Sequence, residues 1–187
     1  MRSFPAQVGL GFGTPLVQPT LPDTVTPTGN RGLVKSNLRD LIAACATFQD
    51  AIGAVGTESE KITQAKLRIH ITAYGAENLE RPFALISSVG NDKSDFEAVS
   101  QYVHGGDIEL RFERTIPEQY KDEPDNAEAD FENFYEGVMA DAITLSVQPG
   151  YFMINSWDIV EGPTQYESDG GGFIYGIRLL INWGLNE

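Results

Sequence analysis

The clearest pattern in the chain is an alternation of apolar and polar positions over residues 173–183. An extended strand here places its large apolar side chains on one face, namely Phe173, Tyr175, Ile177, Leu179, Ile181 and Trp183. A second aromatic-rich strand is predicted over residues 150–161, and residues 162–172 are expected to form an acidic, glycine-containing loop between the two. Loops of this length usually carry contacts, so we expect this strand pair to present a loop to a partner.

Three further segments predict strands. Residues 107–114 alternate most regularly, with Ile108, Leu110 and Phe112 predicted to face inward and Glu109, Arg111 and Glu113 outward. The apolar run over residues 83–89 follows Arg81-Pro82 and is typical of a strand buried on both faces. Residues 66–72 also alternate, although a continuous helix over residues 58–72 is a competing interpretation. The pattern over residues 96–103 is ambiguous.

Helical spacing predicts two main helices and a short one. The first begins at Ser36 and ends before Gly53, with apolar residues three or four apart at Leu38, Leu41, Ile42, Cys45 and Phe48. Residues 58–66 predict the short helix. The longest runs over residues 126–146, after a polar loop, with an apolar stripe of Phe131, Phe134, Tyr135, Val138, Met139, Ala142 and Ile143.

These elements predict an α+β fold, with a largely antiparallel sheet and two main helices on one face. Residues 1–32 differ in composition, because they hold five of the ten prolines together with several glycines. Proline fixes φ and removes a backbone donor, so we expect an extended N-terminal arm followed by a single domain over residues 33–187. The arm also carries apolar side chains, which we expect to lie against a neighbour or its own domain.

The charge is large and unevenly distributed. The formal net charge is −14, made up of +2 over residues 1–75 and −16 over residues 76–187. Binding to nucleic acid requires Lys and Arg to neutralise phosphates, so tight binding of DNA or RNA is not expected, and neither is binding to an anionic membrane. The charge is compatible with a protein that lets nucleic acid pass without binding it, or with simple solubility, which is the commoner reason.

Candidate catalytic, metal and cofactor sites are weak. Gly9, Gly11 and Gly13 follow no predicted strand and open no helix, as a nucleotide-binding loop would require. His70 and His104 have no partner at metal-ligand spacing, and the single cysteine, Cys45, lies in an apolar stripe. The acidic residues 122–130 depart from the EF-hand pattern. We therefore expect no enzyme, no metal and no cofactor.

The ordered set of segments resembles the small neck and tail-terminator proteins of long-tailed bacteriophages. The residues that carry this resemblance are an early helix at Leu38-Arg-Asp-Leu-Ile-Ala-Ala, then Arg81-Pro-Phe-Ala-Leu-Ile, the strand Gly106-Asp-Ile-Glu-Leu-Arg-Phe-Glu, a long helix with Phe134 and Tyr135, and a closing Ile181-Asn-Trp-Gly. The match runs from about Leu33 to Trp183 and rests on pattern rather than on a catalytic motif. It does not include the arm.

The resemblance implies a virion protein, assembled in the host cytoplasm, that forms a ring, usually a hexamer. Such a ring caps the tail tube, joins it to the head connector and lets DNA pass without specific binding. A head-completion, connector or tail-tube subunit of the same particle is the alternative, and a small enzyme or ligand-binding domain comes third. Candidate interface residues are Phe4, Phe12, Leu16, Tyr166 and Asp169. Candidate acids facing the channel are Glu109, Glu113, Asp122, Glu123, Asp125 and Glu167.

Overall fold

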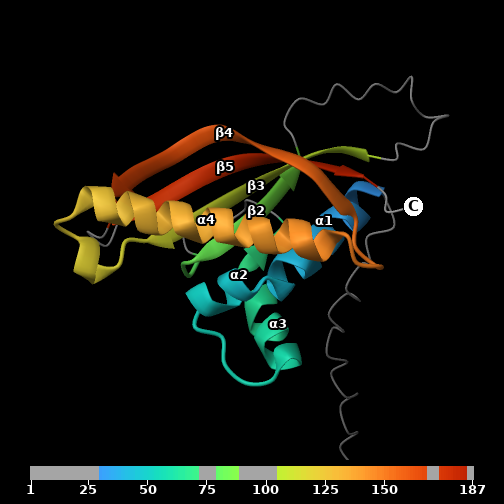
Figure 1. The fold of residues 1–187 in the computed structure, drawn as a ribbon, viewed down its shortest axis with the longest axis horizontal. Coiled ribbons are helices and arrows are strands. Elements are labelled where there is room, and N and C mark those ends of the chain that lie inside the picture. The colour runs from blue at the N-terminus through green and yellow to red at the C-terminus, as the bar shows by residue number, and fades with distance from the viewer. Residues whose placement is uncertain (1–29, 72–78, 89–104, 168–172, 185–187) are drawn as a thin grey trace, which may run out of the picture.

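The computed structural model describes residues 30–71, 79–88, 105–167 and 173–184. They form an α+β fold, in which helices pack against a mixed, mostly antiparallel sheet of five strands (Figure 1). The predicted fold class is confirmed. Residues 1–29 lie outside this description, so the predicted arm is not part of it, and its last positions from Asn30 onward belong to the first helix.

The helices follow the predicted order with shifted ends. The described part of the chain contains α1 (Asn30–Ala44), α2 (Ala46–Ala51), α3 (Glu58–Lys66) and α4 (Pro124–Ser146), with a 3-10 turn over Glu118–Tyr120. Because α4 begins with Pro124, its first turn has one fewer backbone N–H to satisfy. Since α3 ends at Lys66, the competing interpretation of a helix through residue 72 is wrong.

The predicted first helix is in fact two helices that meet at Cys45. This residue has an extended backbone, with φ −68° and ψ 122°. The break turns α2 so that Phe48 packs against Phe112 and Phe134, with ring centroids 6.4 Å away in both cases. The N–H of Thr47 donates to Asp141 Oδ2 at 2.9 Å, so α4 supplies the N-terminal partner that α2 lacks in its own sequence. Gly53, at φ 68°, follows the end of α2 as predicted.

The sheet has the strand order β1-β2-β3-β5-β4. The strands are β1 (Ile69–His70), β2 (Phe83–Ser88), β3 (Gly105–Thr115), β4 (Met153–Glu167) and β5 (Phe173–Gly184). Only β1 and β2 pair in parallel; β2 with β3, β3 with β5 and β4 with β5 are antiparallel. Of the strand predicted over residues 66–72, the structure forms only the two residues of β1, and Leu67 is 72% exposed.

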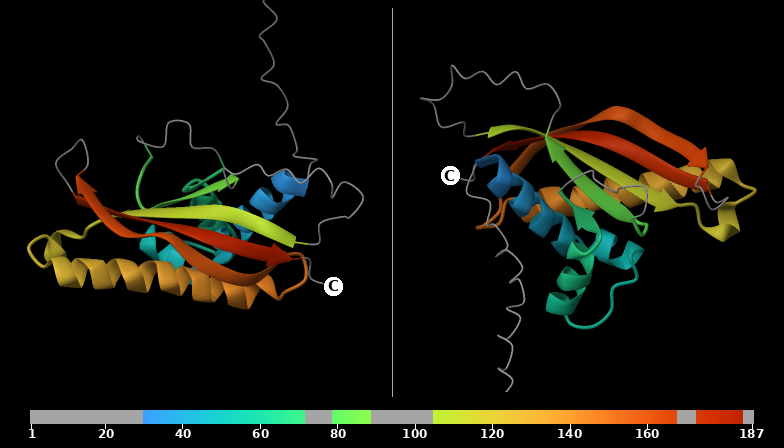
Figure 2. Two further views of the ribbon diagram at one scale, coloured as in Figure 1. Left: turned by 90° about the horizontal axis from the view of Figure 1, so that it is seen from above. Right: turned by 180° about the vertical axis from the view of Figure 1, so that it is seen from behind.

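Helices pack against one face of this sheet. The hydrophobic core contains alternate residues of β3 and β5, among them Leu110, Phe112, Ile177 and Leu179, packed against α1, α2 and α4. Figure 2 shows α4 running along β4 and β5. The apolar stripe predicted for α4 is buried except at Ile143, which is 38% exposed. Since the core uses one set of alternate positions, the other set forms a second face that no described helix covers.

The closing strand pair differs from its prediction. Because β4 extends through Glu167, only residues 168–172 separate it from β5, so the predicted loop over residues 162–172 is wrong. Gly162-Pro163, which suggested a loop, lies within β4 at a stretch of shifted register between Glu161 and Thr164. Proline is tolerated there because β4 is an outer strand of the sheet, where its missing N–H interrupts no ladder.

Candidate assembly surface

The sheet face without helices carries a row of charged side chains. The pairing of β3 with its neighbours places Glu109, Arg111 and Glu113 on this face, together with Arg178 of β5 and Glu161 of β4. Arg111 lies directly opposite Arg178 in the register. Like charges in such a position repel, so the pair depends on the glutamates around it.

Arg178 is held between two carboxylates. Its Nη2 donates to Glu109 Oε2 at 2.8 Å and its Nη1 to Glu161 Oε2 at 3.1 Å. Hydrogen bonds to Glu109 and Glu161 raise the pKa of Arg178 above its ordinary value. The hydroxyl of Ser87, on β2, donates to the other oxygen of Glu109 at 3.2 Å. This network therefore links β2, β3, β5 and β4 through side chains.

Glu113 forms a second network and is buried, with only 4% of the residue exposed. Arg81 Nε donates to Glu113 Oε2 at 2.9 Å, its Nη2 lies 2.9 Å from the same oxygen, and Arg111 pairs with Oε1. The guanidinium of Arg81 also lies 5.6 Å from the ring centre of Phe83. Glu113 lies on the face predicted for it, but it is buried there, because the two arginines cover and neutralise it.

Tyr166 lies beside this network. Its hydroxyl accepts a hydrogen bond from Arg111 Nη2 at 3.3 Å. The pKa of Tyr166 is raised, mainly because the hydroxyl is buried and also because it forms a hydrogen bond with Glu113. The ring lies over Gly176, where an added Cβ would meet Tyr166 carbon and oxygen atoms at 3.2 and 3.3 Å. Gly176 therefore lets the ring lie flat against the sheet.

These side chains surround a hollow of ≈ 410 Å³. Its lining is mixed: Leu85 and the Tyr166 ring are apolar, while Ser87 and Thr164 offer hydroxyls. The six charged side chains of the two networks are three arginines and three glutamates, so they balance: Arg81, Arg111, Arg178, Glu109, Glu113 and Glu161. A partner for this surface is a neutral segment with backbone donors and acceptors, rather than a strongly charged ligand.

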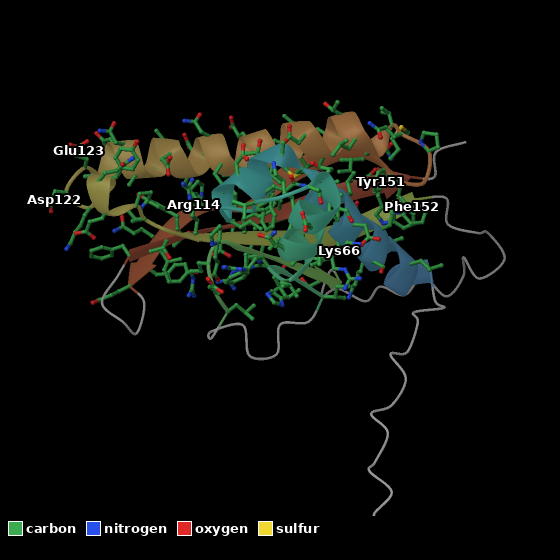
Figure 3. All side chains as sticks on the ribbon, turned by 90° about the horizontal axis from the view of Figure 1, so that it is seen from below. Lys66, Arg114, Asp122, Glu123, Tyr151 and Phe152 are labelled. Carbon is green, nitrogen blue, oxygen red and sulfur yellow. The ribbon has the colours of Figure 1, made fainter. Side chains whose placement is uncertain are left out.

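Acidic side chains that have no Lys or Arg partner among the described residues lie elsewhere, at one end of the molecule and along α4. Figure 3 shows Asp122 and Glu123 beyond the first turn of α4, at the opposite end from Tyr151 and Phe152. Asp125 is also exposed at this end, and Glu167 is exposed at the end of β4. The helix α4 contains six acidic residues and no Lys or Arg. Two of the six have partners in the structure, because Asp130 pairs with Arg114 at 3.0 Å and Asp141 accepts from Thr47.

The other candidate residues divide between described and undescribed parts. Phe4, Phe12, Leu16, Asp169 and His104 lie outside the described residues. Cys45 is buried, its thiol donates to Leu41 O at 3.3 Å, and burial raises the pKa of that thiol. This agrees with its prediction as a small buried hydrophobe.

His70 packs edge-on against Phe83, and burial and then Arg68 lower the pKa of His70. Within residues 30–71, 79–88, 105–167 and 173–184, no group of three or more His, Cys, Asp or Glu is arranged to hold a metal ion. None of the helices in these ranges is both long and apolar enough to cross a membrane.

Comparison with protein-family models and with curated proteins finds no match for this chain. Sequence reasoning missed the two charge networks, although the charged residues of β3 were recognised as one face. The signal for pairing was the alternation Glu109, Arg111, Glu113, in which charges of opposite sign follow one another on that face.

Proposed function

We propose that the chain is a structural subunit of a bacteriophage neck or tail, which assembles head to tail into a closed ring that caps the tail tube and joins it to the head connector. The observation that carries the proposal is the helix-free sheet face, with its balanced charge and its hollow. Subunits with a net charge of −14 repel one another, so contact between copies is favoured where carboxylates are already neutralised. The proposal assigns no catalytic step.

The unpaired acid gives the proposed ring a second surface. The solvent-facing positions of α4 include Asp125, Glu128, Glu132 and Glu136, all exposed. Fixed carboxylates repel phosphates within about a Debye length, ~8 Å at physiological salt, so they act only along a narrow passage. We place α4 and the acidic end around Asp122 and Glu123 toward the passage for DNA. Glu109 and Glu113, our earlier candidates, are ion-paired and contribute little net field there.

The test is the mass of the purified chain in solution, measured by native mass spectrometry and by light scattering, with negative-stain imaging. The expected result is one closed species of several copies, seen as rings with a central opening. Stacked tubes would favour the alternative of a tail-tube subunit. A strictly monomeric chain at high concentration, together with its absence from virions, would refute the proposal.

Two matched variants test which surface makes the contact. Thr164 and Thr144 are both exposed threonines, one on the helix-free face and one on α4. Thr164→Arg adds bulk and charge in the hollow, so it is expected to weaken assembly at least tenfold. Thr144→Arg is expected to leave the assembly constant within about twofold. Equal effects of the two variants would show that the helix-free face is not the contact.

A further inference from the structure

The segment before α1 contains a short alternation of apolar residues and glycines. Over residues 8–13, Val8, Leu10 and Phe12 alternate with glycines at positions 9, 11 and 13. An extended strand with this sequence has three apolar side chains on one side and none on the other. A strip one strand wide cannot bury that side by itself, and burial against a surface yields about 25 cal/mol per Å² of apolar area. The segment therefore requires a surface to cover it.

Sixteen residues, four of them proline, separate this segment from α1. Residues 14–29 include Pro15, Pro19, Pro22 and Pro27, and proline-rich chain extends by about 3.1 Å per residue, or roughly 50 Å for the whole spacer. The chain enters α1 near the end of β5, because Val34 and Ile181 line the same small cavity. Strand geometry places Gly176, at the hollow, only about 17 Å from Ile181. A spacer of this length, if extended, exceeds that distance, so it can also reach the hollow of a neighbouring copy.

Charge favours the same pairing. Residues 1–29 contain one arginine and one aspartate, so their net charge is zero and the whole −14 belongs to residues 30–187. The six charged side chains of the two networks at the hollow also balance, so a neutral segment can approach the hollow without strong repulsion. Leu85 and the ring of Tyr166 offer apolar contact for a side chain such as Phe12. The hydroxyls of Ser87 and Thr164 donate to Glu109 and to Gly162 O, so their oxygens can accept from backbone N–H groups of an extended segment.

We infer that residues 8–13 of one copy lie in the hollow on the helix-free face of a neighbouring copy, so that each subunit of the ring holds the next through its N-terminal segment. This inference rests on the proposed ring and names the contact that closes it. The exchange is directional, since the segment and the hollow are different surfaces, and repeated around a circle it generates a heterologous, closed ring.

Directed disulfide formation in the full chain tests this contact. Cys45 is buried and is not expected to react, so introduced thiols can be studied without replacing it. One preparation carries Leu10→Cys, and a second carries Thr164→Cys with its new thiol activated as a mixed disulfide. Mixing them permits a link only between different copies. The control replaces the second preparation with activated Thr144→Cys, an equally exposed position on α4. Mass spectrometry identifies the linked peptides, and a double variant carrying Leu10→Cys and Thr164→Cys reports links within one chain.

The expected result is a link between copies at position 164 that forms at least tenfold faster than the link at position 144. Equal rates at the two positions, or no link at either, would overturn the inference. A link found only within single chains of the double variant would also overturn it, by assigning the hollow to the subunit's own segment. Native mass spectrometry of the same samples separates the two proposals: intact rings without the link refute this contact alone, whereas monomers throughout refute the proposed function.

Discussion

Removing the charge of Glu113 is expected to destabilise the fold far more than the same change at its neighbour Glu109. Glu113→Gln preserves the shape of the side chain but leaves Arg81 and Arg111 without a counter-ion. Breaking a buried ion pair in this way costs about 3–5 kcal/mol. The side chain of Glu113 is 5% exposed and that of Arg81 18%, but that of Arg111 is 38% exposed and partly solvated. We therefore expect a loss of about 2–4 kcal/mol in the free energy of unfolding.

Glu109→Gln is the matched control, because it removes the same charge from the same strand and the same face. The side chains of Glu109 and its partner Arg178 are 21% and 39% exposed, so water screens this pair more strongly. Exposed ion pairs contribute about 0–1 kcal/mol, and we expect a loss in that range. The difference between the two variants, about 1–4 kcal/mol, is the quantity predicted.

Urea unfolding followed by circular dichroism at pH 7 measures both variants, at two protein concentrations so that assembly is accounted for. With a slope of about 2 kcal/mol per M, Glu113→Gln lowers the midpoint by about 1–2 M. High salt screens exposed charges more than buried ones, so 1 M NaCl is expected to reduce only the effect of Glu109→Gln. Equal midpoints for the two variants would refute the buried pair as a source of stability.

Three further changes give independent tests. Gly176→Ala brings a Cβ to 3.2 Å from the Tyr166 ring and is expected to cost about 1–3 kcal/mol in urea unfolding, whereas Gly162→Ala, with nothing within 4 Å, is expected to cost under about 1 kcal/mol. Because the pKa of His70 is lowered in the folded state, the unfolded chain binds the proton more readily, so stability is expected to fall as pH drops below about 6.5, with a smaller slope in His70→Gln. Glu132→Lys is expected to slow genome release from assembled virions, more strongly at low salt, as measured by dye uptake onto released DNA; an unchanged rate at every salt concentration would contradict a passage lined by α4.

The fold was largely predictable because its periodic segments are long. The alternation in β3 and β5 and the helical stripe of α4 each extend over many residues, so local pattern and tertiary packing agree. The break at Cys45 was not predictable, because the partner that stabilises the new helix start is Asp141, distant in the chain. The length of β4 was missed because Gly162-Pro163 signals a turn, whereas an outer strand tolerates both residues.

The sequence predicted which face of the sheet carries the charged residues, but not that these residues form ion pairs. Period two correctly placed Glu109 and Glu113 on the face away from the core, yet it carries no information about which cations lie across the strands. Arg178 becomes the partner of Glu109 through the register of β3 with β5, and Arg81 reaches Glu113 from the residue pair before β2. Both pairings depend on contacts far apart in sequence, so neither could be found without the sheet.

The division of charge between two surfaces connects the stability of the subunit with its proposed assembly. The pairs of Arg178 with Glu109 and Glu161 are partly exposed, and such pairs contribute little to folding while the face is open to water. When a neutral segment covers that face, the same pairs lose water and become stronger, because screening falls as the dielectric constant falls. Covering the face is therefore expected to tighten the links between β2, β3, β5 and β4. The acidic side chains of α4 have few cationic partners in the described residues, so the negative electrostatic field of this helix is not neutralised. In the proposed ring, the sheet face with the paired charges joins the copies, and the acidic helix α4 faces the DNA.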